Sequence, residues 1–277
     1  MIKLIGSDID GTLVSEGAHR IDPQYYDVIR ELRELGIRFC ACSGRQYPSM
    51  RELFAPVADD IYFISNSGTL IRTTERELFS WSIKPEICLP LIRKIKSIEG
   101  MNLIVGLSDV TLIDAEEESE FLHFVRDEYH YTIRKAEDLS AIDPEGVIEV
   151  SMYCDNVQSV AEKLKKDPAF SDLLWSVSGE RWCDITAKEA GKGEAFALLQ
   201  EYLGIGQEET VYFGDNLNDL PAFREAGVAV TVANARSEMQ EEADIVGESY
   251  SDLGVLRQLQ NIVRHARDYR NAFPEES

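Results

Sequence analysis

The sequence predicts an α/β protein built on a doubly wound parallel sheet, with an α+β domain inserted into it. Residues 1–65 alternate short apolar runs with a helical pattern, the order expected of strand–helix–strand units. These runs are apolar almost throughout, as in a parallel sheet that helices cover on both faces. The alternation stops near residue 84 and resumes near residue 183. We therefore expect a discontinuous core domain, residues 1–84 and 183–277, around an inserted domain at 85–182.

The first core segment has punctuation typical of regular elements. We expect strands at residues 2–7, 37–42 and 61–65, a helix at 23–35, a helix beginning near residue 47, and a hairpin of 70–72 with 78–83. Asp22 can cap the helix at 23–35, Pro23 suits its first position, and Gly36 suits the residue after its end. Pro85 then interrupts the chain, so the domain boundary is placed there.

The inserted domain mixes helical and strand patterns without the regular alternation of the core. Its expected elements are helices at 85–98, 118–129 and 156–165, and strands at 101–105, 110–113, 147–152, 173–177 and 181–185. The core elements that follow are helices at 193–203 and 217–226, with strands at 210–213, 228–232 and 244–246. This order indicates an α+β insert in a doubly wound core.

Composition excludes several classes of protein. The chain has 277 residues, a length that suggests two domains, and a net charge of −22, which opposes binding to nucleic acid. It has no apolar run of the roughly 18 residues that a membrane span needs. The first residues lack signal-peptide features, so a cytoplasmic location is expected. The five cysteines form no CxxC pair, and neither a disulfide framework nor a zinc site is predicted. The sequence does not indicate which oligomeric state the protein adopts.

Two carboxylates follow the first predicted strand. Asp8 and Asp10 emerge at its carboxyl end, where open α/β sheets bind their ligands, and Gly11 suits a sharp turn there. Like charges this close are costly unless a cation lies between them or one is protonated, which indicates a metal site with divided acid–base roles. An Asp-Gly turn without function is the alternative.

Two further segments could bind phosphate. Ser43 and Gly44 end the second strand before a helix, where a hydroxyl and backbone N–H groups can surround phosphate oxygens. Lys192 lies between two glycines at the entrance of the helix at 193–203, well placed to offer an ammonium group to an anion. A plain strand-to-helix loop and a solvated surface lysine are the respective alternatives.

A third cluster, Gly-Asp-Asn-Leu-Asn-Asp, follows the strand at 210–213. It places Asp215, Asn218 and Asp219 at a strand end before a helix. Helix capping explains one acidic residue at such a position but not the whole cluster.

In order and spacing these motifs resemble the haloacid dehalogenase superfamily, which has DxDGT, a strand-end Ser, a helix-opening Lys and GDxxND. The resemblance implies a Rossmann-like core. The insert at 85–182 resembles the class II α/β cap, IIB type, of the Cof-like hydrolases, which dephosphorylate sugar phosphates and related metabolites. Two departures are Asn66-Ser67-Gly68 in place of an Asn-Gly turn, and Pro221 with Ala222 after GDxxND, where methionine is common.

The resemblance assigns roles within a phosphatase that uses Mg²⁺ and an aspartyl-phosphate intermediate. Asp8 would be the nucleophile and Asp10 the acid and base. The other implied residues are Asp8, Asp215 and the Asp10 carbonyl as metal ligands; Ser43, Gly44, Lys192 and Asn218 around the phosphate; and Thr12 and Asp219 in support. The implied partner is a small phosphorylated metabolite, with specificity expected in the inserted domain.

Two alternatives remain at this point. A sugar phosphomutase shares the nucleophile and the acid, and would be revealed by a need for a bisphosphate activator. A non-catalytic phosphate-binding regulatory protein could use the same scaffold, although every motif residue of the enzymes is present.

Overall fold

The computed structural model describes residues 1–116, 119–128, 131–178 and 180–272, which form two compact units. Unit 1 consists of Met1–Gly44, Met50–Leu78 and Gly191–Ser277, and unit 2 of Arg45–Ser49 and Phe79–Ala190. The domain boundaries expected from the sequence, residues 85 and 182, lie inside the limits of unit 2 and stay a prediction.

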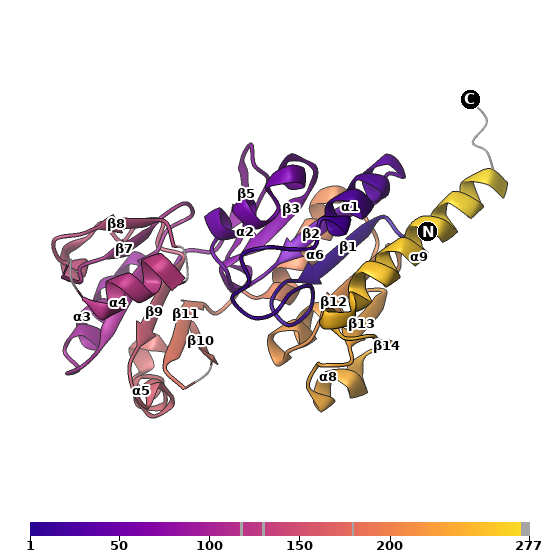
Figure 1. Ribbon diagram of the computed structural model, residues 1–277. Coiled ribbons are helices and arrows are strands. Elements are labelled where there is room, and N and C mark those ends of the chain that lie inside the picture. The colour runs from indigo at the N-terminus through magenta and orange to yellow at the C-terminus, as the bar shows by residue number, and fades with distance from the viewer. Residues whose placement is uncertain (117–118, 129–130, 179, 273–277) are drawn as a thin grey trace. The chain divides into compact units, whose positions relative to one another are not determined.

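The sheet of unit 1 confirms the predicted α/β class (Figure 1). Its strand order is β14 (Ile245–Gly247), β13 (Val228–Val232), β12 (Thr210–Gly214), β1 (Leu4–Asp8), β2 (Arg38–Cys42), β3 (Tyr62–Ser65), β4 (Leu70–Arg72) and β5 (Glu77–Ser80). The neighbours from β14 to β3 are parallel, and β4 runs antiparallel to β3. β1 therefore lies inside the sheet, and its carboxyl end lies beside those of β12 and β2.

Helices cover this sheet on both sides. They are α1 (Gln24–Glu34), α2 (Tyr47–Leu53), α6 (Lys192–Leu203), α7 (Leu220–Arg224), α8 (Ser237–Glu242) and α9 (Gly254–Ala272). α1 packs against α9 (Figure 1), and α6 packs against α7. Sequence reasoning did not predict α9.

The ends of α1 follow the predicted capping. The Gln24 N–H donates to the Asp22 carboxylate at 2.9 Å, which satisfies one of the unpaired donors of the first turn. At the other end Gly36 adopts φ of +75°, and the Ile37 N–H donates back to the Leu32 carbonyl at 2.9 Å. That return bond closes the helix in the way that a left-handed glycine allows.

Unit 2 is a largely antiparallel α+β unit. Its strand order is β10 (Leu173–Ser178), β11 (Trp182–Ala187), β9 (Glu149–Tyr153), β6 (Asn102–Gly106), β7 (Thr111–Ile113) and β8 (Ile133–Lys135). Its helices are α3 (Pro85–Lys96), α4 (Glu120–His123), continued by a π-helical turn at Phe124–Glu128, and α5 (Val157–Leu164). Residues 118 and 129, the expected ends of the helix at 118–129, lie outside the described residues.

The sheet of unit 2 carries a partly buried polar cluster, in which Glu149 and Ser151 are buried. The Ser151 hydroxyl lies 2.8 Å from Glu149 Oε1 and 2.7 Å from Asp184 Oδ1, and the Trp182 ring N–H donates to Asp184 Oδ1 at 2.6 Å. Burial raises the pKa of the Asp184 carboxyl, although hydrogen bonds from its neighbours oppose the rise. Ser151 has one hydroxyl hydrogen, so it can donate to only one of these two carboxyl groups at a time.

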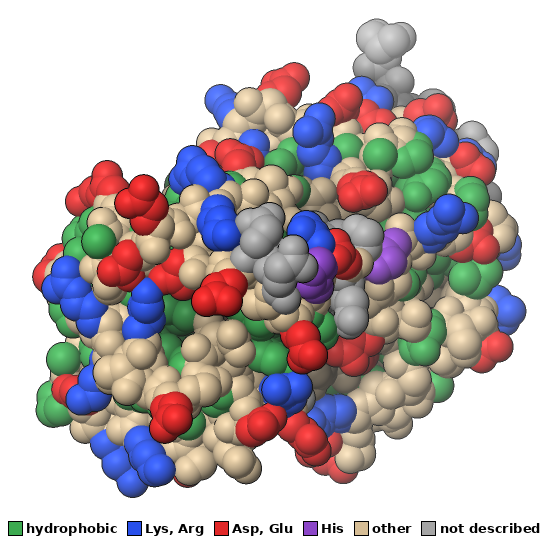
Figure 2. Space-filling view, turned by 60° about the vertical axis from the view of Figure 1, so that its left-hand side comes forward, with side chains coloured by type: hydrophobic (Ala, Val, Ile, Leu, Met, Phe, Trp, Pro, Cys, Tyr) green, Lys and Arg blue, Asp and Glu red, His purple; other side chains and the backbone are tan. Residues whose placement is uncertain are grey.

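The surface carries both charges. On the face shown in Figure 2, Lys and Arg side chains alternate with Asp and Glu rather than forming a continuous basic patch, as far as the described residues extend. Within the same described part of the chain, none of the helices combines the length and the apolar character that crossing a membrane demands.

Candidate active site

Asp8 is the last residue of β1, and its side chain is almost wholly inside unit 1. Its Cα pairs with that of Cys42 on β2, and its exposed fraction is 5%. Burial raises the pKa of the Asp8 carboxyl well above its usual range, while Lys192 lowers it. A carboxylate kept poorly hydrated at a strand end is costly, so it needs cationic partners.

Lys192 is the main cationic partner of Asp8. It is the first residue of α6, and its ammonium Nζ lies 2.6 Å from Asp8 Oδ1 and 2.7 Å from Asp219 Oδ1. Lys192 is 2% exposed and Asp219 is fully buried. Burial lowers the pKa of Lys192, but Asp219 and Asp8 raise it by more, so the lysine stays charged. Lys192 is therefore not a solvated surface lysine, the alternative that the sequence had left open.

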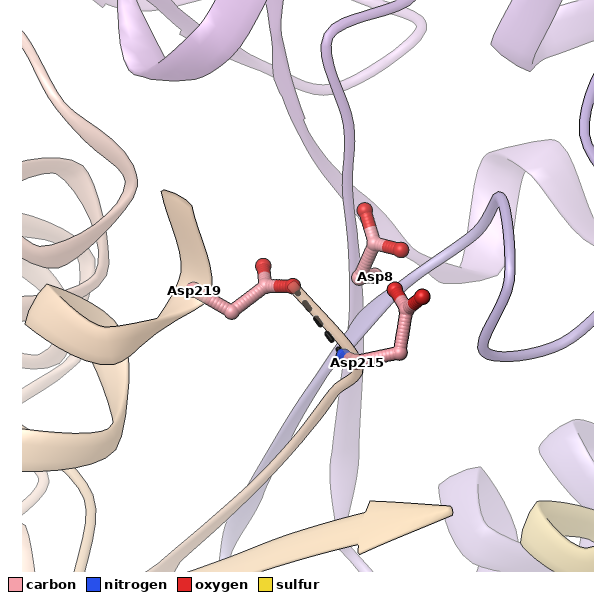
Figure 3. A group of neighbouring side chains, drawn as sticks. All are labelled: Asp8, Asp215 and Asp219. Carbon is pink, nitrogen blue, oxygen red and sulfur yellow. Dashed lines mark hydrogen bonds between the residues drawn. The ribbon is translucent and has the colours of Figure 1, made fainter. Parts of the chain in front are cut away.

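Asp215 follows β12 and faces Asp8 (Figure 3). The Thr12 hydroxyl lies 3.2 Å from Asp215 Oδ1, which fixes that oxygen. Burial, followed by the charge of Asp219, raises the pKa of Asp215 to about 6. Gly11 adopts φ of +83°, and a Cβ on it would lie 2.3 Å from Asp215 Oδ2. Only glycine therefore lets the loop after β1 approach this carboxylate so closely.

These side chains fit a hard divalent cation. One carboxylate oxygen from each of Asp8, Asp215 and Asp219 lies within 4.8 Å of the others (Figure 3). Three carboxylates share one lysine, so the cluster retains a negative charge that a cation would offset. Asp219 uses both of its oxygens, Oδ1 for the Lys192 ammonium and Oδ2 for the Asp215 N–H at 3.2 Å, whereas Asp8 binds Lys192 through Oδ1. Asp8 and Asp215 are therefore the better ligands, and carboxylate oxygens suit Mg²⁺.

Asp10 lies outside this acidic cluster. Its Oδ1 accepts the Gly17 N–H at 3.0 Å, and the Gly11 N–H donates to the Val14 carbonyl at 2.7 Å in the same loop. These bonds fold the chain back on itself after β1 and fix the position of the Asp10 carboxylate in this loop. The structure brings Asp8, Lys192, Asp215 and Asp219 together, whereas the Asp10 carboxylate accepts a backbone N–H from Gly17.

The other predicted phosphate-binding residues are placed by two loops. Ser43 is buried after β2, where its carbonyl accepts the Ser67 N–H at 3.0 Å, and Gly44 after it is exposed. Asn218 is exposed in the 3₁₀ turn Leu217–Asp219, and its side chain makes no hydrogen bond to another of the described residues. Ser43 and Gly44 thus follow the carboxyl end of β2, and Asn218 lies in the turn after the carboxyl end of β12.

Sequence reasoning missed residues that shape this site. Tyr212 on β12 contacts Asp219, and Asn234 donates its side-chain N–H to the Gly11 carbonyl at 2.7 Å. Gly68 adopts φ of +100°, and a Cβ on it would lie 2.2 Å from the Gly191 carbonyl carbon, so this turn packs directly against the start of α6. The predicted strand at 210–213 contains Tyr212 and leads directly into the cluster that begins at Gly214. That position was the sequence signal available for Tyr212.

Comparisons with known proteins identify the family of the chain. The sequence profile of the family described as haloacid dehalogenase-like hydrolase matches residues 5–259. The 5-amino-6-(5-phospho-D-ribitylamino)uracil phosphatase of Escherichia coli is 24% identical, with 95% of this chain and 97% of that protein covered. A solved structure from Eubacterium rectale is 30% identical with a TM-score of 0.85, covering 94% of this chain and 99% of that one. A sugar phosphatase of haloacid dehalogenase subclass IIB has the same fold, at 22% identity and a TM-score of 0.76 over 94% of this chain and 98% of its own.

Proposed function

The chain belongs to the haloacid dehalogenase-like hydrolases and is a phosphatase of that family, and from this premise we propose that Asp8 is its nucleophile, toward the phosphomonoester of a small metabolite. The observation that carries the proposal is the position of Asp8. Its buried carboxylate lies at a strand end, 2.6 Å from the Lys192 ammonium and close to Asp215.

Asp8 would attack phosphorus in line with the ester oxygen. A bond forms between a carboxylate oxygen of Asp8 and phosphorus, and the bond from phosphorus to the ester oxygen breaks. Asp10 would give that leaving oxygen a proton, and would then take one from the water that hydrolyses the aspartyl phosphate. The Gly17 N–H, 3.0 Å from Asp10 Oδ1, supports this role because it fixes the orientation of the acid.

Lys192 would stabilise the charge that develops on the equatorial phosphate oxygens. It is fixed between two carboxylates before substrate arrives, so little reorganisation is needed during the reaction. Ser43, the Gly44 N–H and Asn218 would contact the same oxygens from the ends of two other strands. Such an arrangement suits phosphoryl transfer, where catalysis consists mostly of positioning and charge stabilisation.

Mg²⁺ is the proposed cofactor, held by Asp8, Asp215 and the Asp10 carbonyl. When bound, it would neutralise the nucleophile and the phosphate together. The raised pKa of Asp215, to about 6, supports the proposal because burial and the charge of Asp219 disfavour its ionised form, and a bound cation would offset that effect. Thr12 would orient Asp215, and Asp219 would orient Lys192.

Hydrolysis is favoured over a sugar phosphomutase because the relatives compared above are named as phosphatases. One of those names contains a phosphoribityl compound and another specifies a sugar phosphatase. We therefore propose a phosphorylated sugar or sugar-derived metabolite as substrate, and a screen should start from that class.

The test is phosphate release from a panel of phosphorylated metabolites with Mg²⁺, comparing the wild type with Asp8→Asn. Wild-type protein should hydrolyse at least one sugar-derived phosphomonoester. Acid-quenched mass spectrometry should detect one phosphoryl group on Asp8. Asp8→Asn, purified identically, controls for contaminating phosphatases and should show neither signal. The proposal would be refuted if Asp8→Asn hydrolysed a substrate. It would also be refuted if the wild type hydrolysed none of the metabolites in the panel.

A further inference from the structure

Tyr212 lies in the middle of β12, opposite Gly6 on the neighbouring strand β1, and is fully buried. A Cβ on Gly6 would lie 2.6 Å from Tyr212 Cδ2, so the ring occupies space that only glycine leaves open. The ring also packs edge-on against Phe196 of α6, with centroids 5.1 Å apart, and Phe223 of α7, at 6.1 Å. Contacts on three sides therefore fix the position of the ring and of its hydroxyl.

The Tyr212 hydroxyl lies 3.2 Å from Asp219 Oδ1. Burial raises the pKa of Tyr212 well above its usual range, so the hydroxyl keeps its hydrogen. An ionised carboxylate can only accept, so Tyr212 must be the donor in this hydrogen bond. Phenylalanine would fill the same space, and the hydroxyl is therefore not required for packing.

Asp219 receives donors on both of its oxygens. Oδ1 accepts from the Lys192 ammonium at 2.7 Å and from Tyr212, and Oδ2 lies 3.2 Å and 3.3 Å from the N–H groups of Asp215 and Asn216. Four donors match the acceptor capacity of a carboxylate, which is why it tolerates complete burial. Removing one donor would leave a charged acceptor partly unsatisfied.

We propose that Tyr212 is a positioning residue for the phosphatase reaction, because its hydroxyl holds Asp219 and thereby directs Lys192 toward Asp8. This inference rests on the function proposed above. The Lys192 ammonium lies almost equally far from Asp8, 2.6 Å, and Asp219, 2.7 Å. Without the Tyr212 hydroxyl, Asp219 would compete more strongly for the ammonium and draw it away from the nucleophile and the phosphate.

The experiment compares Tyr212→Phe with a matched control, Tyr26→Phe. Tyr26 is also in unit 1, and its hydroxyl donates to the Leu53 carbonyl at 2.9 Å, away from the acidic cluster. With the substrate found in the panel, Tyr212→Phe should lower kcat roughly 10- to 150-fold, the range expected for one hydrogen bond to a charged group. KM should change less than about twofold, because the ring and the binding groups stay in place. Tyr26→Phe should keep the wild-type kcat.

A second measurement tests whether Tyr212 acts through Asp219. In an Asp219→Asn background, adding Tyr212→Phe should cost less than about twofold in kcat, because the charged acceptor has been removed. A wild-type kcat in Tyr212→Phe, or equal losses in both backgrounds, would overturn the inference while the proposed function stands. A wild-type enzyme that hydrolyses nothing in the panel would instead overturn the proposed function and this inference with it.

Discussion

Replacing Asp215 by asparagine should make the metal-free protein more stable while removing its activity. Asp215 shares one buried cluster with Asp8 and Asp219, and one lysine offsets the three carboxylates. Asparagine keeps an oxygen that can accept from the Thr12 hydroxyl, now 3.2 Å from Asp215 Oδ1. The substitution therefore removes a charge and changes little in shape.

The magnitude follows from the pKa of Asp215, which burial and Asp219 raise from 3.8 to about 6. The folded state binds more protons than the unfolded state between these values, so wild-type stability falls as pH rises through that window. Above pH 6 the full cost is present. It corresponds to about 3 kcal/mol for a fully buried group, and we reduce it to roughly 2 kcal/mol because Asp215 is half-buried.

The assay is urea unfolding followed by circular dichroism in EDTA, at pH 4.5 and at pH 7.5. Asp215→Asn should exceed the wild type by roughly 2 kcal/mol at pH 7.5, with most of this gap lost at pH 4.5. Asp22→Asn is the matched control, since asparagine also caps a helix well, and it should leave stability within about 0.5 kcal/mol. In a separate series with Mg²⁺ in place of EDTA, Mg²⁺ at one hundred times its Kd should stabilise the wild type by about 2.7 kcal/mol, and Asp215→Asn much less.

Equal stabilities of the wild type and Asp215→Asn at pH 7.5 would refute the reasoning, because the acidic cluster would then carry no net cost. A gap of the same size at both pH values would also contradict it, since the effect would then not come from the charge of Asp215.

Three further predictions address other contacts. Lys192→Met should lower kcat roughly 100- to 1,000-fold because it removes the cation next to Asp8. Steady-state phosphate release measures kcat, and a loss below tenfold would contradict the proposed role of Lys192. Gly68→Ala should lower the free energy of unfolding by at least about 2 kcal/mol, because a Cβ there would lie 2.2 Å from the carbonyl carbon of Gly191. An unchanged urea midpoint would contradict this prediction, since it would mean that the turn relaxes without cost. Asp184→Asn should gain stability relative to the wild type as pH rises above 4, because burial raises the pKa of this carboxyl and its ionisation opposes folding. A pH-independent difference in unfolding free energy would count against that explanation.

Local signals predicted much of the fold. The caps of α1 were readable because Asp22 and Gly36 act on their immediate neighbours. The expected helix at 217–226 was partly wrong, since Leu217–Asp219 forms a 3₁₀ turn and α7 begins at Leu220. Pro221 explains the late start, because proline lacks an N–H and fits only the first turn of a helix.

α9 shows a signal that was present but not used. Val255, Leu256, Leu259 and Val263 recur at helical spacing and are buried in the structure. Their partner is α1, more than 200 residues earlier in the chain, as the positions of the two helices show. The periodicity could have predicted the helix, but only the fold reveals which surface it covers.

By itself the sequence determined the chemistry available to this protein. Asp8, Ser43 and Asp215 each follow an apolar strand, and strand ends of a parallel sheet meet at one edge, so their convergence was predictable. The tertiary structure decided how the charges are shared. Lys192 lies 184 residues from Asp8, yet it bridges Asp8 and Asp219, and the hydroxyl of Tyr212 contacts Asp219 from inside the sheet. Such contacts depend on side-chain packing between distant segments, which no local pattern encodes.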